Sequence, residues 1–307
     1  MVETVFSAAL PIGESLVVRK NRMTGLRSRG PRIAIVTGMH GDELAGQFVA
    51  YELIRRLTQS SHNLSGVVDV YPALNPLGIS ARSHGVPQFD IDLDRTFPGN
   101  AGGNLTEALA AAILDDIVGA NACIVIRSSD AYIQEVSQAR IETGNTGALT
   151  KIASLLNVRL VWTREPVAAS QSTLAHALNK RRTPTLVVKM GSDIHHAENE
   201  GAWIVEGILR LLNQMHAWSG PTMALPNPQV SRGDNVSTLL AEEPGLFLPR
   251  SSWGEHIRSG QTIGLVVDPL EGMVRQELKA PCSGLLFALR AYPVVYPGSL
   301  LARILEA

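Results

Sequence analysis

Three short polar segments carry the side chains that could do chemistry. The first, GMHGDE at 38–43, follows an apolar run and places His40 three residues before Glu43. An imidazole and a carboxylate at this spacing, where a strand gives way to a helix, can converge on a metal ion such as zinc. The alternative is that both are ordinary turn and helix-start residues, because glutamate is favoured in the first turn of a helix.

The other two segments offer cations for a carboxylate ligand. One is NPLGISAR, which ends at Arg82, and the other is DLDRTFPG, which contains Asp94 and Arg95. An arginine in a tight loop bounded by proline and glycine can bind a carboxylate through two hydrogen bonds. The alternative for Arg95 is a salt bridge within its own loop, to Asp92 or Asp94.

The elements that position these segments follow from the spacing of apolar residues. Continuous apolar runs predict buried strands at 33–36, 67–71, 124–126, 160–162 and 186–188. Helical segments are predicted near 44–54, 105–118, 146–157, 172–181 and 197–217, and Asn104 with Glu107 has the spacing of a capping box. This alternation predicts an α/β domain with a mainly parallel sheet flanked by helices. Such sheets bind ligands beyond the carboxyl ends of their strands, where the segment at 38–43 lies.

The composition changes near residue 219, where segments rich in glycine and proline form a linker. Beyond it, short extended runs at 245–247, 262–267, 284–287 and 294–296 predict a smaller all-β barrel or sandwich. We therefore expect an α/β domain over 1–220, which carries the pocket, and a β-rich domain over 221–307.

Composition disfavours several classes of partner. The 307 residues contain 27 Lys plus Arg and 28 Asp plus Glu, and the net charge of −1 favours neither nucleic acid nor an anionic membrane. No apolar run approaches the roughly 18 residues that span a bilayer, and the first residues lack a signal-peptide pattern. Cys123 and Cys282 are far apart, which fits a reducing compartment. We expect a soluble cytoplasmic protein.

Together, these segments resemble a known family. The order GMHGDELAG, NPLGISAR, DLDRTFPG, IRSSD and LVVKMG looks like the succinylglutamate desuccinylase/aspartoacylase family, and APCSGLLFALRAYPVVYPGSLLARI looks like that family's barrel appendage. Those proteins are zinc-dependent deacylases on a carboxypeptidase-like α/β fold. The resemblance implies the same fold here, zinc as cofactor and a small carboxylate-bearing N-acyl amino acid as ligand.

The resemblance also implies roles for individual residues. His40 and Glu43 match two of the three zinc ligands. Arg82 and Arg95 match the residues that hold the substrate carboxylate and polarise the scissile carbonyl. Asp94 stands where the family usually has asparagine, which adds negative charge beside Arg95.

Two positions depart from the family at the catalytic centre. Arg127 replaces the third zinc ligand, a histidine, before Ser128 and Ser129, and Lys189 replaces the general base, a glutamate. With Glu43 the formal charge is +1 before any metal binds, so Arg127 can pair with Glu43 in the volume of the metal. Arginine accepts no proton, and Lys189 could act as a base only with a strongly lowered pKa.

Two hypotheses follow. In the first, the chain is a degenerate deacylase that binds a small carboxylate through its arginines and Lys189, without ordinary zinc hydrolysis, as a companion subunit of an active relative. In the second, it is a working metal-dependent hydrolase of amide or ester bonds in small N-acyl amino acids. Its relocated ligands would come from Asp130, His195 or His196. A homo-oligomer is compatible with either, and a silent scaffold with internal salt bridges is a third possibility.

The segment after the altered ligand position offers three more pocket candidates, Gln134, Glu135 and Arg140. Of these, we expect Glu135 to be a surface charge.

Overall fold

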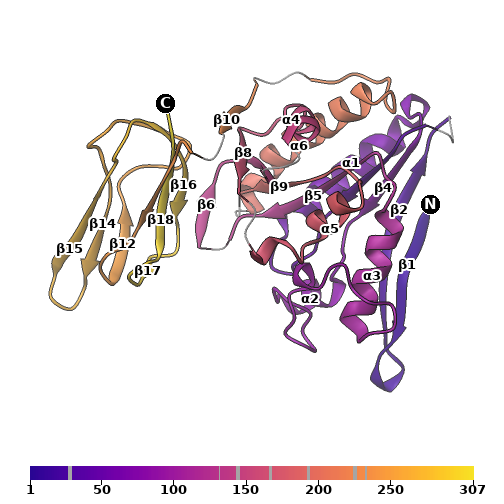
Figure 1. Cartoon of the computed structure of the whole chain (residues 1–307), viewed down its shortest axis with the longest axis horizontal. Helices are drawn as coiled ribbons and strands as arrows, with labels where there is room; N and C mark the ends of the chain where they lie inside the picture. Colours follow the sequence, from indigo (N-terminus) through magenta and orange to yellow (C-terminus); the bar gives the residue numbers. More distant parts are fainter. Residues whose placement is uncertain are drawn as a thin grey trace.

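A large sheet with helices on both faces forms one part of the molecule, and two smaller antiparallel sheets form the other (Figure 1). The structure is a computed structural model and describes residues 1–26, 30–130, 132–142, 146–165, 168–191, 194–223, 227–231 and 234–307. The predicted class, a helix-flanked, mainly parallel sheet with additional β structure, is confirmed.

The large sheet has nine described strands in the order β1-β2-β4-β3-β5-β9-β7-β8-β10. They are β1 (Val2–Ala9), β2 (Ser15–Thr24), β3 (Arg32–Val36), β4 (Val67–Tyr71), β5 (Ala122–Ser128), β7 (Gln138–Glu142), β8 (Leu160–Arg164), β9 (Thr185–Met190) and β10 (Gln229–Ser231). The pairs β3–β4, β3–β5, β5–β9, β7–β8 and β8–β10 are parallel. β1–β2, β2–β4 and β7–β9 are antiparallel.

Helices cover both faces of this sheet, which explains why its central strands are largely apolar. One apolar core lies under α1 (Ala45–Gln59), α4 (Thr146–Ala153) and α6 (Ile194–Gln214). The other lies under α2 (Pro76–Ala81), α3 (Leu105–Ile117) and α5 (Leu174–Lys180). The capping box of Asn104 and Glu107 is present at the start of α3. None of the described helices combines the length and apolarity needed to cross a bilayer.

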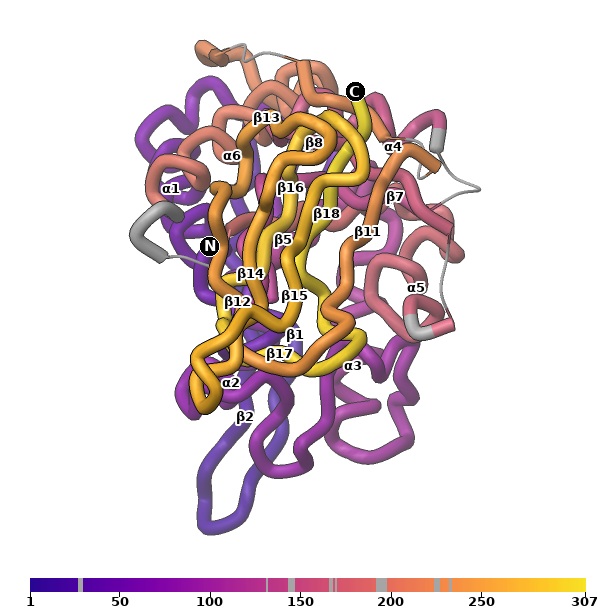
Figure 2. The backbone as a smooth tube through the Cα atoms, turned by 90° about the vertical axis from the view of Figure 1, so that its left-hand side faces the viewer, coloured from indigo at the N-terminus to yellow at the C-terminus, as the bar shows by residue number. Residues whose placement is uncertain are grey.

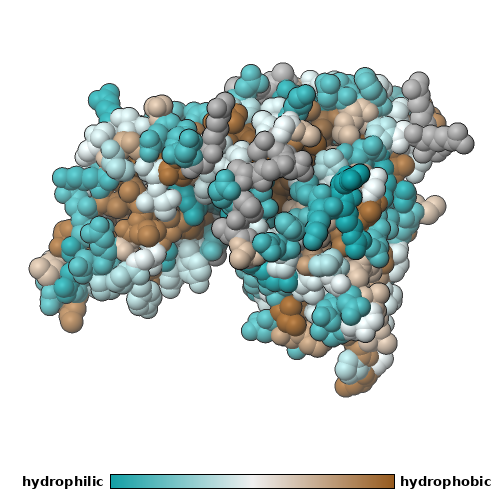
Figure 3. Space-filling view, viewed as in Figure 1, coloured by the Kyte–Doolittle hydropathy of each residue, from teal (hydrophilic) through white to brown (hydrophobic). Residues whose placement is uncertain are grey.

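The C-terminal part is a sandwich of two sheets. One contains β11 (Val236–Leu240), β18 (Leu300–Glu306), β16 (Gly284–Arg290) and β13 (His256–Ile257). The other contains β15 (Met273–Lys279), β14 (Thr262–Asp268), β12 (Gly245–Pro249) and β17 (Val294–Val295). Phe247 from one sheet and Leu286 from the other belong to a single apolar core. Figure 3 shows apolar side chains also gathered on the surface of this part.

Two strands connect the parts. β6 (Ile133–Glu135) follows β5 in the chain but pairs antiparallel with β16 of the C-terminal part. Conversely, β10 lies beyond residue 220 but pairs with β8 in the large sheet. The C-terminal part is therefore attached directly beside the segment that follows β5, as Figure 1 shows. In Figure 2 the molecule is viewed from the side of the C-terminal part, whose strands lie in front.

The turn after β3 is tightly packed at Gly41, because a Cβ there would lie 1.9 Å from the carbonyl carbon of Gly78. We expect Gly41→Ala to lower the free energy of unfolding by about 3 kcal/mol, since backbone atoms of α2 must move. Gly147→Ala is the matched control in α4, where a Cβ meets nothing within 4 Å, and should change stability by at most about 1 kcal/mol. Urea denaturation measures both, and equal stabilities would contradict this packing.

Candidate functional site

His40 lies fully buried in the turn after β3. Its Nε2 lies 2.7 Å from Oδ1 of Asp92, and its Nδ1 lies 3.0 Å from Oε1 of Glu43. The main-chain N–H of Ser128 donates to the other oxygen of Glu43 at 3.1 Å. The imidazole and the Glu43 carboxylate therefore converge on one point, as their spacing predicts.

The guanidinium of Arg127, near the end of β5, occupies that point. Its Nη2 lies 2.9 Å from Nδ1 of His40 and 3.0 Å from Oε1 of Glu43, and its Nε donates to Oε2 of Glu43 at 3.3 Å. Its Nη1 donates to Asp94 at 2.9 Å. The Nε2–H of His40 donates to Asp92, while Nδ1 accepts from Arg127 in the neutral ring and donates to Glu43 in the protonated ring. Burial lowers the pKa of His40, but its hydrogen bonds with Asp92 and Glu43 raise it above the ordinary value. Most N–H groups of Arg127 are thus bound to protein groups.

Two carboxylates supply the negative charge of this cluster. Burial raises the pKa of Glu43, but the hydrogen bond with His40 and the charge of Arg127 lower it to about 2. Burial also raises the pKa of Asp92, and the contacts with His40 lower it to about 2. Complete burial raises the pKa of Asp94 in spite of its bond to Arg127. Glu43 and Asp92 are therefore ionised at neutral pH.

Zinc, which the family resemblance implies, does not fit between His40 and Glu43 in this arrangement. The ion would have to lie about 2.0–2.2 Å from both ligand atoms, but the Arg127 guanidinium already bridges them. Zinc placed about 4 Å from a guanidinium would cost around 8 kcal/mol at an effective dielectric near 20. A metal would need Arg127 to leave.

A second group of possible ligands lies around His40. Nitrogen atoms of His40 and His84 and an oxygen of Asp92 lie within 4.8 Å of one another and could hold a metal ion. However, the two imidazole rings are stacked, with centroids 3.8 Å apart and planes 9° apart. Their lone pairs, which lie in the ring planes, do not meet. The half-exposed His84 ring, held by Asp42 at 3.1 Å, must turn before both rings can bind one ion.

Three further cations lie on the same face of the sheet as Arg127. In the strand register Lys189 of β9 is opposite Arg127, while Arg140 of β7 and Arg164 of β8 follow at even offsets. Burial and the charge of Arg140 lower the pKa of Lys189 to about 8. Among the residues that the structure describes, the side chains of Lys189 and Arg164 have neither a hydrogen bond nor an ion-pair partner within 4 Å. These two cations remain available to a ligand.

The expectation that Glu135 is a surface charge is wrong. Its side chain is buried and lies 2.9 Å from Arg140 and 3.5 Å from Arg303. The reason is the pairing of β6 with β16, which encloses Glu135 between the two parts of the molecule. Glu135 therefore neutralises part of the positive charge beside Lys189.

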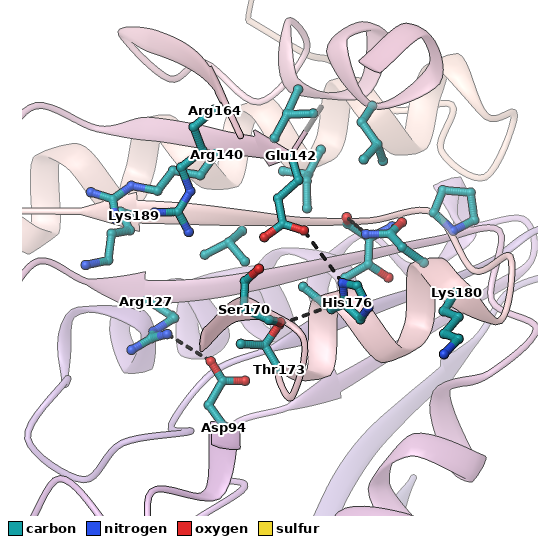
Figure 4. Close-up of a pocket in the computed structure, with 18 of the residues that line it drawn as sticks. Asp94, Arg127, Arg140, Glu142, Arg164, Ser170, Thr173, His176, Lys180 and Lys189 are labelled. Atoms are coloured by element: carbon teal, nitrogen blue, oxygen red, sulfur yellow. Dashed lines mark hydrogen bonds and ion pairs between the residues drawn. The ribbon is translucent and has the colours of Figure 1, made fainter. Parts of the chain in front are cut away.

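Two connected hollows flank Arg127. The outer hollow, of about 640 Å³, contains Glu43, Asp92 and Arg95. The inner hollow, of about 810 Å³, is lined by α5, β7 and β9. Both are lined by Asp94, Arg127, Arg140, Arg164 and Lys189. Figure 4 shows the heads of Arg127, Arg140 and Lys189 gathered at one end of the inner hollow, with Lys180 at the other.

Most of the site residues proposed from the sequence come together here. The outer hollow is lined by Asp94, Arg95, Arg127, Ser128, Ser129, Asp130 and Lys189. Arg82 is not among its lining residues, because it caps α2 with its side chain exposed. The side chains of His195 and His196 fall outside the described residues. Arg164 was missed, although its position two residues after an apolar strand was a usable signal.

The fold is similar to that of zinc carboxypeptidase-like α/β proteins. A metallo-carboxypeptidase from Burkholderia cenocepacia superimposes with a TM-score of 0.52 at 12% identity, over 70% of this chain and 65% of that one. The product-bound ectoine utilization protein EutE from Ruegeria pomeroyi superimposes with a TM-score of 0.85 at 18% identity, over 100% of this chain and 95% of that one. A succinylglutamate desuccinylase/aspartoacylase from Rhodobacter sphaeroides gives 0.82 at 20% identity, over 99% and 95%.

The sequence comparison is more specific. Residues 29–122 match the model of the succinylglutamate desuccinylase/aspartoacylase catalytic domain. N-alpha-acetyl-L-2,4-diaminobutyric acid deacetylase from Halomonas elongata is 22% identical over 295 residues, which are 91% of this chain and 83% of that protein. Residues 29–122 thus match the catalytic domain of the succinylglutamate desuccinylase/aspartoacylase family, which the motifs indicated, and the whole chain shares the fold of the solved structures above.

Removal of Arg127 should be costly, because Arg127→Ala leaves Glu43 and Asp94 without their cation. We expect the free energy of unfolding to fall by about 3–5 kcal/mol. Arg181→Ala, which breaks an exposed pair with Asp115, is the control and should cost at most about 1 kcal/mol. Chemical denaturation compares them, and a small effect at Arg127 would be inconsistent with a structural guanidinium.

The lowered pKa of Glu43 also makes stability depend on pH. A carboxyl group with a pKa of about 2 when folded and 4.5 ordinarily stabilises fully above its unfolded pKa and loses this contribution as pH falls. The stability difference between the wild type and Glu43→Gln should therefore shrink between about pH 5 and pH 3. Urea titrations at several pH values measure it. A difference that stays constant would argue against the ionised carboxylate.

Proposed function

We propose that this family member binds a small carboxylate-bearing ligand and does not act as an ordinary zinc deacylase. The observation that supports this is the contact of Arg127 with both His40 and Glu43, at 2.9 and 3.0 Å. The permanent positive charge of Arg127 lies between the two residues that match zinc ligands of the family, and it replaces the charge of the metal ion. A partnership with an active relative, as companion subunit, would fit a chain of this kind.

The proton chemistry points the same way. Hydrolysis of an amide needs an activated water and a base that accepts its proton. Arg127 accepts none, and Lys189, with a pKa of about 8, is mostly protonated at neutral pH. The ammonium of Lys189 and the guanidinium of Arg164 instead offer positive charge to a carboxylate, with Arg95 at the half-exposed edge of the outer hollow.

Elemental analysis with one designed variant tests this proposal. We expect the purified wild type to hold no stoichiometric zinc and to lack turnover of N-alpha-acetyl-L-2,4-diaminobutyric acid, the substrate in the relative's name. Arg127→His should gain zinc, since it removes the competing cation and adds an imidazole. The control, Arg127→His with His40→Ala, should lose it again. Stoichiometric zinc in the wild type, with turnover that His40→Ala abolishes, would refute the proposal.

A working metal-dependent hydrolase with relocated ligands is the second candidate. The cluster of His40, His84 and Asp92 favours it. This candidate requires metal in the wild type that is lost in His84→Ala, whereas the first requires metal-free protein in both. The same elemental analysis therefore separates them.

A further inference from the structure

The inner hollow is elongated. It follows β9 from Lys189, near the carboxyl end of the strand, towards Thr185 at its start. The side chain of Asn179 fixes α5 along this path through bonds of 2.7 and 3.0 Å to the main chain of Thr185. Four residues of extended strand span about 13 Å. A ligand that fills the hollow is therefore long rather than compact.

One end of the hollow has positive charge without matching negative charge. Arg140 is bound by Glu135, whereas Lys189 and Arg164 have no ion-pair partner in the described part of the chain. Like charges this close repel one another, and partial burial strengthens the repulsion. An anion between Lys189 and Arg164 would remove this repulsion.

Beyond the charged end, the hollow is lined by both apolar and polar side chains. Val187 lies on the same face of β9 as Lys189, and Ile141, Leu149 and Leu186, which belong to the buried core under α4, border the hollow beside it. Glu142 and His176, on the middle stretch, face each other at 3.7 Å and partly neutralise one another, whereas Lys180 lies at the far end of the hollow, which Arg182 also lines. The middle stretch therefore favours a hydrocarbon chain over a second ionised group.

We propose that the inner hollow is a binding site for an elongated carboxylic acid. Its carboxylate lies between Lys189 and Arg164, and its carbon chain follows β9 towards α5. This inference rests on the proposed function, because the same cations bind the carboxylate, and it adds the shape of the ligand. The two hollows therefore have different roles, because the carbon chain of the ligand occupies the inner hollow, on the opposite side of Arg127 from His40.

Lys189 should therefore strengthen the binding of the acid while lowering the stability of the ligand-free protein. Lys189→Met keeps a long side chain but removes a partly buried, unpaired ammonium. We expect this variant to be at least as stable as the wild type without ligand, and to bind acids at least about tenfold more weakly. Lys151→Met is the matched control, because Lys151 is exposed on α4 and lines neither hollow.

Calorimetric titration of the full-length chain with acetate, butyrate, hexanoate and octanoate tests the site. Affinity should rise by up to about fourfold per added methylene until the hollow is filled. Lys189→Met and Arg164→Met should each weaken hexanoate binding, and Lys151→Met should not. Affinity independent of chain length, unchanged binding in both cation variants, or a destabilised Lys189→Met would overturn the inference.

The proposed function and this inference fail differently. Stoichiometric zinc with turnover in the wild type would refute the proposed function, but it would not change the expected rise of affinity with the length of the acid. Equal binding of acetate and octanoate refutes only the latter.

Discussion

The candidate site depends on one buried guanidinium. Arg127 joins Glu43, from the turn after β3, to Asp94, from the loop before α3, and touches His40 on the way. A carboxylate out of water needs a partner, and the charge of Arg127 is one of the contacts that keep Glu43 ionised there. Because most N–H groups of Arg127 are bound to these protein side chains, its role is to hold the site together. The neighbouring cations, Lys189 and Arg164, are the ones that can bind a ligand.

The central strands of the large sheet could be predicted because they are apolar on both faces. β3, β4 and β9 lie between two helical layers, and each contains a short run of apolar residues. β7 was not predicted, because QARIE alternates polar and apolar residues and is a strand only through its partners β8 and β9. β6 has three residues and pairs with a strand about 150 residues away, so no local pattern could reveal it.

The candidate site, too, could be predicted only where local sequence motifs determine it. His40, Glu43 and Arg127 come from segments with recognisable motifs, and opposite charges at neighbouring strand ends indicate a pair. The places of Arg164 and Glu135 depend instead on the register of β7 with β8 and of β6 with β16. Register between distant strands follows from packing of the whole sheet, which a single sequence does not display.

Glu135 links the C-terminal part to the charge of the pocket. It is shared by Arg140 of β7 and Arg303 of β18, on a strand that the C-terminal sheet itself holds in place. If the two parts separated, Arg140 would lose its anion and join Lys189 as an uncompensated cation. Domain docking and anion affinity are thus thermodynamically coupled: an anion in the pocket lowers the free-energy cost of separation, and separation tightens the hold on the anion.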